Sequence, residues 1–162
     1  MEKLKIIIAD DMDIISERIK NIIEKRENTE IVGIAKDGEE EKKMIIEETP
    51  DLVFTDNQMP KMNGVDVIKE FLNLDNRPYF VLVTGDRDIE IMRNMYEYKV
   101  VTIINKPFED KDVIQAINEY MVIKENQVKE EMEVNNIVKI ENTKQSLWEK
   151  IKKFFLRKNE QR

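Results

Sequence analysis

Five polar side chains follow or close short apolar runs of the sequence, and together they could bind a phosphoryl group. Asp10 and Asp11 follow the first run, Asp56 follows the third, Thr84 closes the fourth and Lys106 comes just after the fifth. Three neighbouring carboxylates repel one another unless a cation lies among them, and Mg²⁺ prefers oxygen ligands with water in the remaining positions. A hydroxyl and an ammonium group nearby would suit an anion. Each residue alone is usually a turn former, a helix cap or a surface charge, so their shared position after strands carries the prediction.

The composition excludes several other kinds of chemistry. The 162 residues include no Cys and no His, which removes disulfides, thiolate zinc sites, Cys nucleophiles and His bases. The net charge of −7 argues against a general nucleic-acid binder, since phosphates are neutralised by positive surfaces. No apolar run is long enough for a signal segment or a membrane span, so we expect a cytoplasmic protein.

Strand-length apolar runs alternate with helix-like segments over the first two thirds of the chain. The predicted strands are Leu4–Ala9, Glu30–Ala35, Leu52–Thr55, Tyr79–Thr84 and Val100–Ile104. The predicted helices are one capped by Asp13 with Ile15, Ile19, Ile22 and Ile23 on one face, a weaker one after Gly38, and Val65–Leu72, Ile89–Met95 and Val113–Ile123. This alternation predicts an α/β fold with a doubly wound parallel sheet, whose functional residues lie at the carboxyl ends of the strands.

Four segments resemble the receiver domains of response regulators in two-component and phosphorelay signalling. They are Ile6–Asp11 (IIIADD), Val53–Gly64 (VFTDNQMPKMNG), Val81–Gly85 (VLVTG) and Asn105–Phe108 (NKPF). The resemblance covers about residues 3–123, which we expect to form the receiver domain. It implies a CheY-like, flavodoxin-like fold of five parallel strands and five helices.

The resemblance also implies how the phosphoryl group is received. Asp56 would accept it from a histidine kinase or a histidine phosphotransfer protein, Thr84 would hydrogen-bond it and Lys106 would pair with it. Only self-phosphorylation from a donor and slow self-dephosphorylation are then expected as chemistry. The face made by the fourth helix, fifth strand and fifth helix would respond, and it is the expected surface of a homodimer. Ile103 stands where most relatives carry Tyr or Phe, and Lys106-Pro107 is a candidate cis peptide bond.

A metal ion is the second implication of the resemblance. Asp11 would bind Mg²⁺ directly, Asp10 would help through water, Asp56 would supply a carboxylate oxygen and Gln58 its backbone carbonyl. This fits the chemistry, because attack of a carboxylate on a phosphoryl group depends mostly on positioning and on charge neutralisation.

Two other identities stay open on the residues alone. Asp11-Met12-Asp13 after an apolar strand also resembles the nucleophile motif of haloacid-dehalogenase phosphatases, in which the first Asp attacks phosphate and the second is a general acid. The closing acidic pair of that family is missing, since Glu109 and Asp110 begin a predicted helix. The opening residues 1–5 resemble the receiver half of the sporulation master regulator, which would imply a role in transcriptional control.

The C-terminal segment differs in charge from the rest of the chain. Residues 144–162 carry a net charge of +5 and residues 1–143 a net charge of −12. Residues 124–143 are predicted as a linker or as an extension of the last receiver helix. Residues 144–162 are predicted as a separate basic amphipathic helix, with Ser146 as N-cap and Glu149 at the third position.

Three roles for this basic helix are open. It could pack on its own receiver domain or a second copy, bind an anionic membrane weakly through residues 146–158 at its inner face, or dock into a partner protein. A DNA-binding output domain is not expected, because the segment is too short for a winged helix and shows no helix-turn-helix pair.

Overall fold

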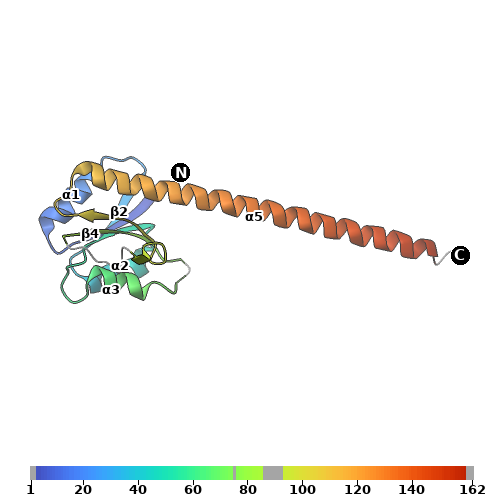
Figure 1. The fold of residues 1–162 in the computed structure, drawn as a ribbon, viewed down its shortest axis with the longest axis horizontal. Helices are drawn as coiled ribbons and strands as arrows, with labels where there is room; N and C mark the ends of the chain where they lie inside the picture. The colour runs from blue at the N-terminus through green and yellow to red at the C-terminus, as the bar shows by residue number, and fades with distance from the viewer. Residues whose placement is uncertain (1–2, 75, 86–92, 160–162) are drawn as a thin grey trace. The chain divides into compact units, whose positions relative to one another are not determined.

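Five parallel strands form the sheet of this computed structural model, in the order β2-β1-β3-β4-β5 (Figure 1). The structure describes residues 3–74, 76–85 and 93–159. The strands are β1 (Leu4–Ala9), β2 (Thr29–Ala35), β3 (Leu52–Thr55), β4 (Tyr79–Thr84) and β5 (Val100–Asn105). The order is that of the flavodoxin-like doubly wound fold, in which the carboxyl ends of β1, β3, β4 and β5 lie along one edge of the sheet. The predicted fold class is therefore confirmed.

Apolar side chains cover both faces of the sheet, because both faces of a parallel sheet are packed under helices. Side chains alternate along each strand, so Ile6 and Ile8 of β1 join one core cluster and Ile7 joins the other. The described helices are α1 (Asp13–Ile23), α2 (Gly38–Glu48), α3 (Gly64–Glu70) and α5 (Asp110–Asn159). Residues of α1 and the first turns of α5 complete the first cluster, and residues of α2 and α3 complete the second.

The predicted strands agree closely with the structure, whereas the helix starts agree less well: α3 begins at Gly64 rather than Val65, and α5 at Asp110 rather than Val113. Three strands have the predicted bounds, and β2 and β5 are each one residue longer. Helix α1 begins at Asp13, but its N-cap is Met12, and no side chain caps the helix. Asp13 does not cap because its carboxylate pairs with Lys36 at 2.6 Å. The helix predicted over residues 89–95 falls largely outside the described residues.

Helix α5 runs without a break from Asp110 to Asn159. The prediction that a separate helix starts at Ser146 is therefore wrong, and residues 124–143 are helical rather than a linker. The physical reason lies in the composition: no Gly or Pro follows Pro107, and Glu, Lys, Gln and Met favour helix throughout this segment. The chain divides within this helix into two compact units: the first ends at Met121 and the second begins at Val122.

The second unit leaves many large apolar side chains exposed to solvent. Those with described side chains are Val122, Val128, Met132, Val134, Ile137, Val138, Ile140, Leu147 and Trp148. None of the described helices combines the length and the apolar character that a membrane crossing requires.

Among the described residues of the first unit, a single glutamate is fully buried. Glu41 of α2 has no exposed surface, and its Oε2 atom accepts a hydrogen bond from the Thr55 hydroxyl at 2.9 Å. Its Oε1 atom is buried without a hydrogen-bond partner among the described residues. Burial raises the pKa of the Glu41 carboxyl to about 8, although the hydrogen bond from Thr55 opposes that rise. Glu41 is therefore neutral in the folded protein at pH 7.

Replacing Glu41 by Gln should change how the free energy of unfolding depends on pH. Between about pH 5 and about pH 8 the folded wild type holds a proton that the unfolded chain has released, so its stability falls as the pH rises. Glutamine does not titrate, and the variant should lack this part of the decline, which approaches about 1.4 kcal/mol per pH unit. Urea denaturation across this range measures the difference.

The exposed neighbour Glu39 provides the matched control, because Glu39→Gln should leave the pH dependence of stability unchanged. Parallel wild-type and Glu41→Gln curves would contradict the buried, neutral state of Glu41.

Candidate functional site

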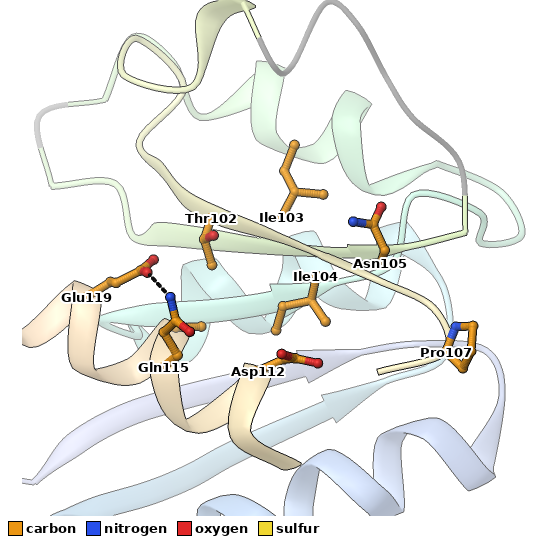
Figure 2. Close-up of a pocket in the computed structure, with 9 residues that line it drawn as sticks. Thr102, Ile103, Ile104, Asn105, Pro107, Asp112, Gln115 and Glu119 are labelled. Carbon is orange, nitrogen blue, oxygen red and sulfur yellow. Dashed lines mark hydrogen bonds between the residues drawn. The ribbon is translucent and has the colours of Figure 1, made fainter. Parts of the chain in front are cut away.

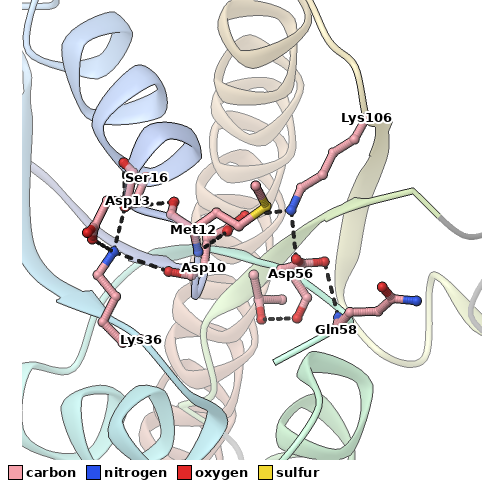
Figure 3. Close-up of polar contacts among 9 residues, drawn as sticks. Asp10, Met12, Asp13, Ser16, Lys36, Asp56, Gln58 and Lys106 are labelled. Atoms are coloured by element: carbon pink, nitrogen blue, oxygen red, sulfur yellow. Dashed lines mark hydrogen bonds and ion pairs between the residues drawn. The ribbon is translucent and has the colours of Figure 1, made fainter. Parts of the chain in front are cut away.

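The Lys106 ammonium group joins two carboxylates from different strand ends. Its Nζ atom lies 2.7 Å from Asp10 Oδ2 and 2.6 Å from Asp56 Oδ2. Asp10 follows β1, Asp56 follows β3 and Lys106 follows β5, so the contact spans the carboxyl edge of the sheet. Figure 3 shows the Lys106 side chain reaching from the end of β5 to Asp56. The structure thus brings together three of the residues that the sequence predicted for the site.

Burial of this contact shifts the pKa values of Asp10 and Lys106. The side chains of Asp10 and Asp56 are almost fully buried, and that of Lys106 is largely so. Burial raises the pKa of Asp10, while hydrogen bonds from Lys106 and from the Met12 N–H oppose the rise without cancelling it. For Lys106, burial lowers the pKa, but the hydrogen bonds and charges of Asp10 and Asp56 outweigh it and raise the pKa overall. Lys106 is therefore charged at neutral pH.

Hydrogen bonds with backbone groups hold both the main chain and the carboxylate of Asp56. Its N–H donates to the Ala9 carbonyl at 2.9 Å, which continues the ladder between β1 and β3. Its Oδ1 atom accepts from the Gln58 N–H at 3.1 Å, so the carboxylate is held by the loop that follows it. One carboxylate oxygen thus lies on a backbone donor and the other on Lys106.

Asp11 completes a group of three carboxylates. One carboxylate oxygen from each of Asp10, Asp11 and Asp56 lies within 4.8 Å of the other two. Asp11 is exposed, so this side of the group is open to solvent. The donor set consists only of oxygen atoms, as Mg²⁺ requires, and the spacing allows all three to approach one small ion. These residues therefore fit a divalent cation.

Thr84 lies on β4, the strand next to β3, and Ile103 lies on β5, one strand further along the sheet. Thr84 closes β4 as a fully buried residue, and its carbonyl accepts from the Lys106 N–H at 2.9 Å. Thr84 and Lys106 are therefore neighbours at the sheet edge. Ile103 of β5 is half-buried and packs against the core cluster on the α2 and α3 side. The Lys106-Pro107 peptide bond is cis, as predicted.

Lys36 is a second cation beside the site, and sequence analysis did not identify it. Its Nζ atom donates to the Asp10 carbonyl at 3.3 Å and to the Ser16 hydroxyl at 2.8 Å, and it pairs with Asp13 (Figure 3). The sequence could have indicated Lys36 by its position directly after β2, which is the neighbour of β1 in the sheet. The Asp13 carboxylate is thereby held on the Lys36 side, and it is outside the group of three carboxylates.

Comparisons with known proteins agree on one family. A sequence model of the family described as response regulator receiver domain matches residues 6–118. Chemotaxis protein CheY of Thermotoga maritima is 30% identical over 114 residues, which are 70% of this chain and 94% of CheY. Sensory transduction protein LytT of Bacillus cereus is 26% identical over 131 residues, which are 81% of this chain and 52% of LytT. The chain thus spans about half the length of LytT.

A solved structure shows the same fold. The REC domain of AraT, a response regulator from Geobacillus stearothermophilus, superimposes with a TM-score of 0.66 at 26% identity. The superposition covers 76% of this chain and 98% of the AraT chain.

Replacing Lys106 by Met should destabilise the fold at neutral pH. The change leaves two buried carboxylates close together without their shared cation, and we expect a loss of about 1–3 kcal/mol in the free energy of unfolding. Lys111 provides the control, since it pairs with Glu109 where both side chains are mostly exposed. Lys111→Met should cost less than about 0.5 kcal/mol. Equal unfolding midpoints for Lys106→Met and the wild type would contradict a stabilising role of this contact.

Proposed function

The chain belongs to the response regulator receiver domain family of two-component signalling, and we propose that Asp56 is the residue that receives its phosphoryl group. The donor would be a histidine kinase or a histidine phosphotransfer protein. The observation that carries this proposal is the placement of Asp56, which is shared between Lys106 and a backbone N–H at the edge of the sheet. A carboxylate held in this way is already aimed and partly neutralised.

The transfer forms one bond and breaks one. An Asp56 carboxylate oxygen attacks phosphorus while the bond from phosphorus to the donor imidazole nitrogen breaks, and the imidazole keeps the electron pair and takes up a proton. Lys106 supplies positive charge to the oxygens of the transferring group. The Thr84 hydroxyl would then hydrogen-bond the phosphoryl group. The acyl phosphate on Asp56 would hydrolyse slowly, and no separate substrate is turned over.

We propose Mg²⁺ as the cofactor of this site. Asp11 would hold it directly, Asp10 through water, Asp56 through a carboxylate oxygen and Gln58 through its backbone carbonyl. When bound, the ion neutralises negative charge on the phosphoryl oxygens. The fit rests on the three carboxylates described above, of which Asp10 and Asp56 contact Lys106.

The signal would leave the domain through β5 and α5. Phosphorylation adds charge and acceptor oxygens at Asp56, which would draw Lys106 away from Asp10. Lys106 directly follows β5, and the surface of β5 and α5 contains a hollow of about 320 Å³ that includes Ile103 among its lining residues (Figure 2). Asp112 and Glu119 give this hollow an acidic side. We propose this surface as the contact for a partner or for a second copy of the chain.

The basic end of α5 supports a second, weaker contact. Leu147 and Trp148 are exposed, and Lys144, Lys150 and Lys152 lie close to them in the sequence. Aromatic and basic side chains suit the interface of an anionic membrane, where one short amphipathic segment binds reversibly. We propose that the protein is cytoplasmic and makes such a contact through residues 146–158.

Replacing Asp56 by Asn should abolish phosphorylation. With acetyl phosphate and Mg²⁺, the wild type should gain one acid-stable, base-labile phosphoryl group, and Asp56→Asn should gain none because an amide does not act as the nucleophile. Intact-protein mass spectrometry measures the added mass. Asp13→Asn is the control and should be phosphorylated like the wild type. Loss of labelling in Asp11→Asn together with labelling of Asp56→Asn would instead support phosphatase chemistry at Asp11 and Asp13.

Replacing both Leu147 and Trp148 by Ala should weaken flotation with anionic liposomes. The change removes two apolar side chains of the segment 146–158, the only Trp of the chain among them, and leaves all charges in place. The double variant Val134→Ala, Ile137→Ala is the matched control, because it removes exposed apolar side chains from the same helix outside the basic segment. No flotation of the wild type, or equal flotation of all three proteins, would rule out this membrane contact.

A further inference from the structure

A hydrogen bond connects helix α2 to the residue that precedes Asp56. Thr55 ends β3, and its hydroxyl donates to Glu41 Oε2 at 2.9 Å. The same hydroxyl lies 3.4 Å from the backbone carbonyl oxygen of Asp56. Glu41 and Thr55 both have no exposed surface. The contact therefore lies inside the protein, directly behind the phosphoacceptor.

The protonation state of Glu41 suits a relay to the Asp56 backbone. Burial keeps the carboxyl neutral, and no ion pair involves it among the described residues. A neutral carboxyl still offers its Oε2 atom as the acceptor of the Thr55 hydroxyl, and it carries no charge that burial would penalise. This hydrogen bond holds the Thr55 hydroxyl in place, 3.4 Å from the Asp56 carbonyl oxygen.

The space around this relay is filled by backbone. A Cβ atom at Gly64, the first residue of α3, would lie 2.5 Å from Thr55 Oγ1 and 2.4 Å from the Asp56 carbonyl oxygen. Any side chain at position 64 would therefore push the hydroxyl or the carbonyl away. The Thr55 hydroxyl, the Asp56 carbonyl and the start of α3 are thus in mutual contact, and Glu41 contacts them from the α2 side.

The same end of α2 holds the loop that follows Asp56. A Cβ atom at Gly38 would lie 2.2 Å from the Met62 carbonyl oxygen, so the helix and the loop touch through their backbones. Asp37, the N-cap of α2, pairs with Lys61 at 2.6 Å. Lys61 has a φ of 64°, a left-handed conformation that a residue with a side chain adopts only when its surroundings hold it there. Helix α2 therefore supports this loop at several points.

We propose that Glu41 is a positioning residue for phosphoryl transfer, acting through the Thr55 hydroxyl to fix the backbone of Asp56 and the loop 57–63. This inference rests on the proposed phosphorylation of Asp56. Stability alone does not account for Glu41, because a buried carboxyl with an unpartnered oxygen is less favourable than an apolar side chain of similar size. The hydrogen bond it provides to Thr55 is what an apolar residue would lack.

Two substitutions separate positioning from packing. Glu41→Met keeps the approximate volume and removes the partner of Thr55, so the folded protein should be as stable as the wild type or more stable. Its phosphorylation by acetyl phosphate with Mg²⁺ should nevertheless slow by about tenfold, the scale of one lost buried hydrogen bond. Glu41→Gln keeps a neutral group that can both donate and accept, and it should retain the wild-type rate within about twofold. Glu39→Met on the exposed side of α2 is the control and should change neither quantity.

Amide hydrogen exchange over residues 57–63 provides a second readout that does not need phosphorylation. Exchange in this loop should be faster in Glu41→Met than in the wild type and Glu41→Gln, with no change in β1 or β4. A wild type that is not phosphorylated would refute the proposed function, and the exchange data would then decide the positioning role by themselves. Wild-type rates and wild-type exchange in Glu41→Met would overturn the proposal, as would equal slowing in Glu41→Met and Glu41→Gln.

Discussion

Charge compensation at the carboxyl edge of the sheet is the constraint on which the rest of the site depends. Three carboxylates meet there, two of them buried, and Lys106 is the cation that touches both buried ones. Burial disfavours charged carboxylates, and the ammonium group offsets that cost only while it stays within hydrogen-bond distance. A phosphoryl group and a divalent cation could therefore replace the contacts of Lys106 with Asp10 and Asp56. Lys106 follows β5, so the contact links the two buried carboxylates to that strand.

The sheet makes this constraint possible through its topology. Parallel strands in the order β2-β1-β3-β4-β5 bring the ends of β1, β3 and β5 to one edge, although Asp10 and Lys106 are 96 residues apart. Helices pack on both faces and hold the strands in register, so the two apolar clusters keep the geometry of the site fixed. Helix α2 adds a polar support behind Asp56 through Glu41 and Thr55. The Asp56 side chain is thus held by the charge of Lys106, and its backbone lies beside the neutral hydrogen bond between Thr55 and Glu41.

The strands were predictable because they are buried on both faces. A continuous apolar run such as that of β1 is recognised from its own residues, without information on the neighbouring strands. The ends of such runs are marked by Asp, Pro or Asn. Helix ends were less predictable, because capping depends on which partner a side chain finds. Asp13 finds Lys36 instead of the N–H groups of its helix, and Ser146 lies inside a helix that continues past it. The first error comes from a contact with a residue distant in the sequence, and the second from the helix-favouring composition on both sides of Ser146.

The amino-acid sequence by itself determined the order of the elements, the absence of Cys and His chemistry, and the residue types at the strand ends. Those features follow from periodicity and composition, which are local properties of the chain. Only the tertiary structure decided that Lys106 bridges Asp10 and Asp56, that Lys36 reaches Asp10, and that Glu41 is buried against Thr55. Glu41 stands in a run of charged residues at the start of a weakly amphipathic helix, where no pattern distinguishes the buried glutamate from its exposed neighbours. Its burial is set by the packing of α2 against β1, β2 and α3, which is a property of the fold and not of the segment.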